Sequence, residues 1–389
     1  MKNAVIVSAL RTPVGRYKGA LSSIPAYKLG AIVVEEAVKQ TKLEPDQVDQ
    51  VIFGNLFSHD IANMARMVSL EAGLPVQLPG ITLDRQCSSS LDAIAYASLL
   101  IQCGYAQIVI AGGCESDSTR PFVMEKQADA FPRIPPSFLN LKLAPEKVGD
   151  PPMGITAENV AIEYSVGRDE CDEFALNSHK KAATAWDAGF FDNHVVPVEI
   201  ALPKGEKVVI SKDETVRPDT MLEKLKKLRP AFQENGVVTA GNSSPMSDGA
   251  AAVIIMEEKL AEKMGLDVLA MFKNYTVAGV DPKLMGIGPV PATNALLDKE
   301  GLSIDDIDLI ELNEAFAAQS IPCIKELGID SSRLNVNGGA IALGHPLAAS
   351  GAIVTARLVF EMKNRDATKG LVTFCCGGGQ GVALLFTRK

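Results

Sequence analysis

The sequence predicts an α/β fold in which a largely parallel, buried sheet is built from two similar halves with an irregular region between them. Three observations support this fold. Apolar strand-like runs alternate with helix-like segments from the first residues onward, one segment near the start recurs near the end, and the middle is rich in proline. The chain has 389 residues, of which 47% are hydrophobic and 22% are charged. This length and composition suit two or three folded domains.

Strand-like and helix-like segments follow one another in order. The apolar runs predict strands at 4–10, 48–55, 108–113, 371–376 and 382–386. Helical spacing of apolar residues predicts helices at Tyr27–Lys39, Asn63–Ala72, 88–104, 155–165 and 168–189. The helix after Cys87 begins with serines suited to capping and stops at Gly104, and the helix at 168–189 ends at Gly189.

An internal repeat links the two ends of the chain. The segment LEPDQVDQVIFGN at 43–55 aligns with LSIDDIDLIELNE at 302–314, with leucine, aspartate and branched aliphatic residues at matching places. Both copies follow a helix and lead into a strand. We therefore expect the first and last ~120 residues to be duplicated α/β halves. Chance similarity between two helix-loop-strand units is the alternative.

The region between the halves has a different composition. Seven prolines lie between Pro121 and Pro152, at 121, 132, 135, 136, 145, 151 and 152, so a continuous helix or central strand is excluded there. Long irregular excursions of this kind commonly form lids or binding loops. Residues 201–230 hold eight Lys and Arg (204, 207, 212, 217, 224, 226, 227, 229) against five acidic residues (206, 213, 214, 219, 223), a local excess of +3. Such a stretch is either a solvated surface or a site for an anionic ligand.

Charge and cysteine content narrow the functional classes. The net charge of −9 disfavours nucleic acid as a partner, since phosphate neutralisation needs clustered Lys and Arg. Arg11 follows an apolar run that is too short for a signal peptide, and no run approaches the ~18–20 residues of a membrane span. Seven cysteines without a C-x-x-C pair argue against a disulfide framework and a zinc site. We expect a cytoplasmic protein without a metal site.

Cys87 is a candidate nucleophile. It lies at a strand-to-helix junction, where unpaired N–H groups and the helix dipole favour a thiolate and can lower the thiol pKa below its usual ~8.5. Most cysteines in apolar surroundings are small core residues instead. We expect that simpler role for Cys103, Cys114, Cys171 and Cys323.

Three other segments carry candidate functional groups. His345 follows a glycine-rich turn in NVNGGAIALGHP (335–346) and precedes a helix rich in small residues, whereas His59, His179 and His194 are expected to be structural. The glycines of LVTFCCGGGQG (371–381) open a strand rather than a helix, so they are not a dinucleotide motif, but they can aim N–H groups at an oxyanion. LNEAFA (312–317) places Asn313 at the end of the second repeat's strand.

These motifs together resemble the thiolase family over nearly the whole chain. The resemblance is carried by QCSSSLDA, PMGITAENVA, LRPAF, TAGNSSPMSDGAAA, NEAFA, NVNGGAIALGHP and CCGGGQG. It implies a duplicated five-layered αβαβα fold with an inserted loop domain. The implied domains are an N-terminal half at 1–118 completed by about 248–268, a CoA-binding loop domain at 119–247, and a C-terminal half at 269–389.

The resemblance also implies a role for each candidate residue. Cys87 looks like the nucleophile that becomes acylated, His345 like the residue that activates it, and Cys375 like the acid and base. Asn313 would hold a water molecule that forms one oxyanion hole with His345. The backbone N–H groups of Cys87 and Gly377 would form a second oxyanion hole.

Three further residues are implied to bind substrate. Ser244 would lie along the pantetheine of coenzyme A, and Arg217 with the basic stretch would lie near its nucleotide. Met153 belongs to a P-M-G sequence similar to that of degradative 3-ketoacyl-CoA thiolases, which favours acyl chains longer than C4. Ala348 departs from the G-H-P-x-G pattern, and its methyl group could narrow the pocket.

The implied activity is the reversible conversion of 3-ketoacyl-CoA and CoA to acyl-CoA and acetyl-CoA, through an acyl-Cys87 intermediate. Coenzyme A and acyl-CoA would be substrates, with no permanently bound cofactor, and the protein would be a homodimer or homotetramer. One alternative is a non-catalytic acyl-CoA or lipid-binding relative. Another is a decarboxylating ketoacyl synthase, which would need His or Asn at Cys375. Strand alternation does not say whether Cys375 or Cys376 faces the site, and only the family register selects Cys375.

Overall fold

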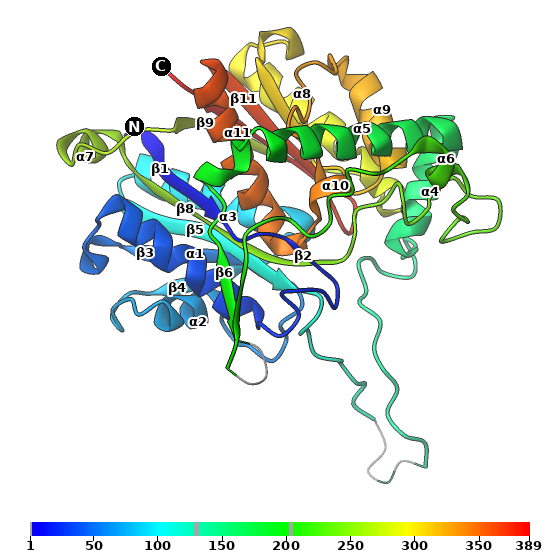
Figure 1. Cartoon of the computed structure of the whole chain (residues 1–389), viewed down its shortest axis with the longest axis horizontal. Helices are drawn as coiled ribbons and strands as arrows, with labels where there is room; N and C mark the ends of the chain where they lie inside the picture. Colours follow the sequence, from blue (N-terminus) through cyan, green and yellow to red (C-terminus); the bar gives the residue numbers. More distant parts are fainter. Residues whose placement is uncertain (1, 128–130, 132, 202–204) are drawn as a thin grey trace.

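A single ten-stranded sheet runs through both halves of the chain in the computed structural model, which describes residues 2–127, 131, 133–201 and 205–389 (Figure 1). Its strands are β1 (Ala4–Arg11), β2 (Gly15–Arg16), β3 (Gln50–Gly54), β4 (Gly80–Leu83), β5 (Ile108–Ser116), β8 (Ser247–Glu257), β9 (Ala270–Gly279), β10 (Leu309–Leu312), β11 (Lys369–Cys376) and β12 (Gln380–Thr387). A separate ribbon pairs β6 (Val198–Ala201) with β7 (Lys207–Ile210).

Helices cover both faces of this sheet. They are α1 (Ala26–Thr41), α2 (Met64–Glu71), α3 (Ser89–Gln102), α4 (Met153–Glu163), α5 (Arg168–Asp187), α6 (Leu222–Lys226), α7 (Glu258–Lys263), α8 (Pro289–Glu300), α9 (Ala317–Leu327), α10 (Ala340–Leu343) and α11 (Ser350–Arg365). Short 3₁₀ turns are η1 (Pro45–Gln47), η2 (Gln86–Ser88), η3 (Phe190–Asn193), η4 (Pro282–Ile287), η5 (Ile304–Asp306) and η6 (Leu347–Ala349). No helix in the described ranges is long and apolar enough to cross a membrane.

The strand order shows the duplication directly. The first half runs β4-β3-β5-β8-β1, and the second half runs β9-β12-β11-β10, so that the two halves mirror each other about the β1–β9 seam. Equivalent pairs have the same direction, because β3–β5 and β10–β11 are parallel while β5–β8 and β11–β12 are antiparallel. Only Val5–Met271 and Ile6–Ala270 pair across the seam.

The prediction of a largely parallel sheet is wrong. Antiparallel pairs join β8 to β1 and β5, and β12 to β11 and β9, so the sheet is mixed. The turn at Gly377–Gly379 is too short for a crossover, which forces β12 to return antiparallel to β11. The strands still read as continuous apolar runs because helices bury both faces.

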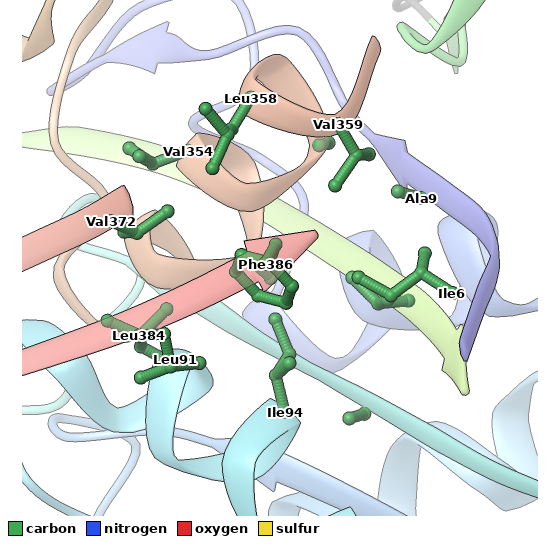
Figure 2. Packing of buried hydrophobic residues seen from close by; sticks show 14 of the residues in the cluster. Ile6, Ala9, Leu91, Ile94, Val354, Leu358, Val359, Val372, Leu384 and Phe386 are labelled. Atoms are coloured by element: carbon green, nitrogen blue, oxygen red, sulfur yellow. The ribbon is translucent and has the colours of Figure 1, made fainter. Parts of the chain in front are cut away.

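Five layers result from this arrangement, as predicted. Helices α1 and α2 pack on the outer face of the first half, and α8 and α9 pack on the outer face of the second. Helices α3 and α11 lie between the halves and contact each other. Figure 2 shows this middle layer, where Leu91 and Ile94 of α3 and Leu358 of α11 pack with Phe386 of β12.

Both copies of the sequence repeat fold alike, which confirms the predicted duplication. Each begins with a 3₁₀ turn closed by a capping box, η1 in the first copy and η5 in the second, and leads into a strand. The carboxylate of Asp49 accepts N–H bonds from Gln107 and Ile108 at the start of β5. Asp308 accepts the equivalent bonds from Thr368 and Lys369 at the start of β11.

The chain between β5 and β8 leaves the sheet and then returns to it. The described residues of the proline-rich stretch, 121–127, 131 and 133–152, have little regular structure and belong to a long excursion that projects from the body of the protein (Figure 1). The segments α4, α5, the β6–β7 ribbon and α6 follow, and β8 then pairs with β1 and β5. Pro132 of the proline-rich stretch and Lys204 of the basic stretch lie outside the described residues. The exact domain boundaries stay a prediction.

Candidate active site

Cys87 occupies a tight turn between β4 and α3. The turn η2 contains it, and the preceding Gln86 has a φ of 50°, a conformation that is uncommon for a residue other than glycine. The hydroxyl of Ser89 holds the turn by donating to the Gln86 carbonyl at 2.6 Å. The Cys87 side chain is only 3% exposed and belongs to the middle apolar layer. A strained, buried turn therefore presents the thiol.

The thiol of Cys87 is not preionised, which corrects the expectation from its place near a helix N-terminus. Burial, helped by the charges of Asp84 and Glu115, raises the pKa of Cys87 to about 12. Hydrogen bonds from the backbone N–H groups of Gly377 and Cys87 lower the pKa, but burial outweighs them. The thiol consequently needs a base at the moment of reaction. That these two N–H groups form the second oxyanion hole stays a prediction.

Cys375 and Cys376 end strand β11, next to a turn made of Gly377, Gly378 and Gly379. Gly378 and Gly379 have φ values of 81° and 83°, which favour glycine. Burial raises the pKa of both thiols, and in each case the Cys87 charge is the strongest of the raising charges. Both cysteines therefore lie within electrostatic range of Cys87.

The two cysteines differ in their surroundings. Cys376 packs in the middle layer with Val372 and Phe374, as alternation along the strand requires. Its thiol also donates to the Ser88 hydroxyl oxygen at 3.1 Å, so it faces the turn that carries Cys87 rather than lying away from it. Cys375 is fully buried and points to the opposite face of the strand by the same alternation.

His345 and Asn313 meet in the second half of the site. The Asn313 side-chain nitrogen lies 3.3 Å from His345 Nε2, and His345 Nδ1 lies 2.6 Å from the Ser350 hydroxyl. Burial lowers the pKa of His345 to about 4, so its imidazole is neutral at pH 7. Asn313 Oδ1 is buried and has no partner among the described residues. The turn η6 begins two residues after His345 and packs against η2, which contains Cys87.

Asn335 fixes the chain that carries Asn313, and the sequence analysis missed this role. Asn335 Oδ1 accepts the Leu312 N–H at 3.0 Å, and Asn335 Nδ2 donates to the Leu312 carbonyl at 2.9 Å and to Glu314 at 2.8 Å. Asn313 itself donates its backbone N–H to Thr373 of β11 at 3.0 Å. The φ of Asn335 is 42°. Asn335 is the first residue of the NVNGG sequence, and no pattern in that sequence marked it as a clamp.

A pocket of about 460 Å³ lies beside the basic stretch. Its charged lining residues are Arg16, Arg217, Lys224, Glu214 and Asp219, of which Glu214 pairs with Arg16 and Asp219 pairs with Lys224, each at 3.0 Å. Leu225, Leu228 and Ile341 bring apolar surface. Ser244 lies between two lining residues, and its hydroxyl donates to the Ala315 carbonyl at 3.0 Å. Ala315 follows Asn313 by two residues, so the pocket is close in the chain to the buried centre.

His179 lines this pocket, where it contacts the backbone of the basic stretch. Its Nδ1 accepts the backbone N–H of Arg217 at 3.2 Å. Burial, followed by the charge of Arg217, lowers the pKa of His179 to about 4. The lone pair of His179 thus holds the backbone of Arg217 in place.

Met153 begins α4 and is half-buried. The next residue, Gly154, lies under the ring of Phe232, and a Cβ at that position would come within 2.3 Å of the ring. Phe232 stacks edge-on against Phe316, which follows the NEA sequence. Met153 is therefore the chain neighbour of a residue that packs on Phe232, and Phe232 contacts the segment that contains Asn313.

The remaining cysteines divide into two groups. Cys114, Cys171 and Cys323 are buried, as predicted. Cys103 is exposed, contrary to the prediction, because it caps the C-terminal end of α3 where the chain turns at the surface. All seven cysteines are free thiols, and no group of three or more His, Cys, Asp or Glu side chains in the described part of the chain could hold a metal ion.

Comparison with known proteins gives consistent matches over the full length. The thiolase N-terminal domain family matches residues 4–259, and the thiolase C-terminal domain family matches residues 266–388. The chain is 47% identical to an acetyl-CoA acetyltransferase of Pseudomonas aeruginosa and 45% identical to a 3-oxoadipyl-CoA/3-oxo-5,6-dehydrosuberyl-CoA thiolase of Escherichia coli, with 100% of both chains covered in each case.

Solved structures agree with these sequence matches. The Bacillus anthracis acetyl-CoA acetyltransferase has a TM-score of 0.95 and 43% identity, and the match covers 100% of this chain and 99% of that one. Human mitochondrial 3-ketoacyl-CoA thiolase in complex with CoA has a TM-score of 0.93 and 39% identity, with 100% and 98% covered. The duplicated fold and these full-length matches lead to one conclusion: this chain belongs to the thiolase family, and it is an acyltransferase.

Proposed function

We propose that this protein reversibly transfers an acyl group between coenzyme A and acetyl-CoA through an acyl-Cys87 intermediate. The observation that carries the proposal is the buried Cys87 thiol, which faces the backbone N–H groups of Gly377 and of Cys87 itself. Two preorganised N–H donors in a dry site stabilise the oxyanion that forms when a thiolate attacks a carbonyl. Such a donor contributes about 3–4 kcal/mol to transition-state stabilisation.

In thiolysis, His345 Nε2 accepts the proton of Cys87 while the sulfur attacks the 3-keto carbon. The bond between the α-carbon and the keto carbon then breaks, leaving the acyl group on sulfur and the enolate of acetyl-CoA. Cys375 gives its proton to the α-carbon, and it later takes the thiol proton of the incoming CoA. The CoA sulfur then attacks the acyl carbon, the bond from that carbon to the Cys87 sulfur breaks, and the Cys87 thiolate regains its proton from His345. The raised pKa of Cys375, caused by burial and by the Cys87 charge, keeps this thiol protonated until it is needed.

The enolate oxygen needs its own donors. His345 Nε2, once protonated, provides one, and a water held by Asn313 provides the other in this proposal. The free, buried Oδ1 of Asn313 supports that assignment, since it is an acceptor that a water molecule satisfies. The two oxyanion sites would thus serve the two half-reactions separately.

Coenzyme A would enter along the pocket that Arg217 lines, and no permanently bound cofactor is needed. Arg217 suits its phosphates, while Leu225 and Ile341 suit its apolar parts. The human mitochondrial relative was solved in complex with CoA. We propose that Ser244, next to this pocket, lies along the pantetheine arm and that Met153 lies near the acyl group.

The decisive experiment follows the Mg²⁺–acetoacetyl-CoA enolate absorbance after addition of CoA. We expect the absorbance to fall with the wild type and not with Cys87→Ser, because a hydroxyl is a poor nucleophile and a poor leaving group here. Intact-mass analysis after acetyl-CoA should show one added acetyl group on the wild type and none on Cys87→Ser. Binding without turnover on any 3-ketoacyl-CoA would favour the non-catalytic alternative, and release of CO₂ from a malonyl donor would favour the synthase.

The substrate range follows from the same assay with 3-ketoacyl-CoA from C4 to C16. Curated relatives named acetyl-CoA acetyltransferase support activity on acetoacetyl-CoA. The P-M-G sequence at Met153 supports activity on longer chains. A fall of kcat/KM to background at C6 would contradict the second expectation.

We also propose a cytoplasmic homodimer or homotetramer. The projecting segment exposes large apolar side chains that a second copy could cover: Phe122, Phe131, Ile134 and Phe138 are between 66% and 93% exposed. Free thiols at all seven cysteines suit a reducing compartment. Light scattering that shows a monomer at micromolar concentration would overturn the oligomer, and fractionation of cells tests the compartment.

A further inference from the structure

We infer that Arg85 is a positioning residue that holds the Gly377 N–H beside the Cys87 sulfur. The inference rests on the proposed function, in which the N–H groups of Gly377 and Cys87 stabilise an oxyanion. Arg85 takes no part in the bond changes. It acts on the two turns that carry these donors, which are η2 and the glycine turn 377–379 between β11 and β12.

The side chain of Arg85 contacts one end of the glycine turn. Its Nη1 donates to Gln380 Oε1 at 2.8 Å, a contact between residues that are 295 positions apart in the sequence. Gln380 is the first residue of β12, and it pairs with Cys376, the last residue of β11. The guanidinium therefore fixes the strand that leaves the turn.

The backbone carbonyl of Arg85 is linked to the other end of the same turn. The Ser88 hydroxyl donates to this carbonyl at 3.1 Å and accepts the thiol proton of Cys376 at 3.1 Å. A hydroxyl group can donate and accept at once, so the two bonds coexist. Because Cys376 and Gln380 face each other across the β11–β12 pair, Arg85 is joined to both strands at the base of the turn.

Arg85 is itself fixed by α3, the helix that follows Cys87. Its Nε donates to the carboxylate of Asp92, whose side chain is only 3% exposed and which lies in the first turn of α3. Asp92 Oδ1 also accepts the Tyr275 hydroxyl at 2.6 Å. Burial, followed by the charge of Asp92, raises the pKa of Tyr275, so this hydroxyl keeps the proton that it donates. The guanidinium is thus held at Nε while Nη1 contacts Gln380.

The glycine turn depends on such neighbours for its position. Gly378 and Gly379 have positive φ values of 81° and 83°, and glycines bring no side chain that could pack the turn in place. The two turns already approach each other closely, since a Cβ on Gly377 would lie 3.2 Å from Gln86 Oε1. A turn released from Arg85 would move the Gly377 N–H relative to the thiol.

The position of this N–H affects the rate at one step. When the Cys87 thiolate adds to the acetyl carbonyl of acetyl-CoA, a C–S bond forms and the π pair of the carbonyl moves onto oxygen, to which Gly377 donates. The pair returns as the bond to the CoA sulfur breaks, and that sulfur takes a proton from Cys375. A shift of about 1 Å in a positioned group costs up to about 10²-fold in rate. The loss falls on the transition state rather than on binding.

The test uses three variants of this contact in the full-length protein. Arg85→Lys keeps the charge and can still pair with Asp92, but a single ammonium group lacks the fork that bonds Asp92 and Gln380 together. Gln380→Met removes the acceptor and leaves the Arg85 charge in place. Gln380→Glu restores an acceptor.

Arg333→Lys is the matched control. The Arg333 side chain is 22% exposed, against 24% for Arg85, and it also bonds a carboxylate, that of Asp305, together with further acceptors. These bonds are made at η5, before β10, and none of them involves η2 or the glycine turn. A general loss of arginine contacts therefore affects both variants, whereas a loss of position at Gly377 affects Arg85→Lys alone.

Two measurements are made on each protein. Acetylation of Cys87 is timed by intact mass in single turnover over a range of acetyl-CoA concentrations. The carbonyl stretch of the acetyl-Cys87 thioester is then read from infrared difference spectra between ¹²C and ¹³C carbonyl-labelled acetyl groups. An N–H that donates to the carbonyl oxygen weakens the C=O bond and lowers this frequency, so the spectrum reports on the donors directly.

We expect Arg85→Lys and Gln380→Met to raise the carbonyl frequency and to lower the maximal acetylation rate by about 10- to 100-fold, with the half-saturating acetyl-CoA concentration unchanged. The wild type, Gln380→Glu and Arg333→Lys should share one frequency. If Arg85→Lys does not fold, Gln380→Met alone decides the result. A wild-type frequency in Gln380→Met would overturn the inference, whatever its rate. Failure of the wild type to take up an acetyl group would overturn the proposed function, and the inference with it.

Discussion

The thiol of Cys376 donates a hydrogen bond to the Ser88 hydroxyl oxygen at 3.1 Å. Ser88 follows Cys87, and Cys376 follows Cys375, so two residues outside the proposed chemistry join the nucleophile's turn to the end of β11. This contact joins two elements that are far apart in the sequence, the turn that contains Cys87 and the end of β11.

The first prediction separates the two neighbouring cysteines. Cys375→Ser should still accept an acetyl group on Cys87, but it should lose exchange of the acetyl-CoA methyl protons with D₂O and lose condensation. Cys376→Ala should retain exchange, while its free energy of unfolding falls by about 1–2 kcal/mol through the lost hydrogen bond and the small cavity. If instead Cys375→Ser retains exchange and Cys376→Ala loses it, the base is Cys376. The proposed contact between the Gly377 N–H and the oxyanion would then have to be reassigned.

The second prediction concerns the clamp beneath Asn313. Asn335→Asp replaces a donor by a carboxylate oxygen facing the Leu312 carbonyl and the Glu314 carboxylate, both of which need a donor. Urea denaturation should show a loss of about 3 kcal/mol or more in the free energy of unfolding. Asn337→Asp is the matched control, because Asn337 is also buried and its Nδ2 has no partner within the described residues. Equal losses in the two variants would argue against the clamp.

The third prediction concerns coenzyme A. Arg217→Ala should raise KM for CoA about fivefold, the factor that corresponds to ~1 kcal/mol for an exposed charge, and should leave kcat unchanged. Lys207→Ala removes a charge from the same basic stretch, but Lys207 pairs with Glu199 in the β6–β7 ribbon, so KM should stay constant. An unchanged KM in Arg217→Ala would remove Arg217 from the CoA site.

The fourth prediction is a pH dependence of stability. Burial and the Arg217 charge lower the pKa of His179 from 6.5 to about 4. Between pH 6.5 and 4 the unfolded chain binds this proton and the folded protein does not, so the stability present above pH 6.5 is lost as the pH falls to about 4. Full loss corresponds to on the order of 3 kcal/mol.

The variant His179→Asn isolates this effect, because Asn Oδ1 can still accept the Arg217 N–H. Denaturation curves from pH 7.5 to 4 should show a shallower loss of stability in His179→Asn than in the wild type. Parallel curves would mean that His179 is protonated equally in both states.

Local patterns predicted the elements and the duplication, because those depend on residues that are neighbours in sequence. The capping residues Glu44 and Ser303 and the aspartates Asp49 and Asp308 act within or next to their own repeat, and the repeat was visible in the sequence. Local patterns did not mark β8 or β9 as strands, and the mixed character of the sheet was missed; only the family resemblance implied that about 248–268 completes the first half. The pairing of β8 with β1 and β5 is set by a return of the chain after more than 100 residues.

The pKa of Cys87 and several contacts of the site also could not be predicted from residues that are neighbours in the sequence. A helix N-terminus next to Cys87 predicted a lowered pKa, but the raised pKa is a consequence of packing by both halves around the thiol. The contacts of Ser350 and Asn335 depend on one hydroxyl and one amide in the folded loops, and no periodicity marks them. The role of His179 similarly depends on the approach of a segment 38 residues away.

The paired turns η2 and η6 have a consequence for stoichiometry. Each precedes a middle-layer helix, α3 or α11, and the two turns pack against each other. The central residue is Cys87 in one turn and Ala348 in the other. The duplicated scaffold therefore has two equivalent turns and places a thiol in only one of them. Under the proposed function each chain would carry a single acyl group, and the half without this thiol would supply His345, Asn313 and Cys375.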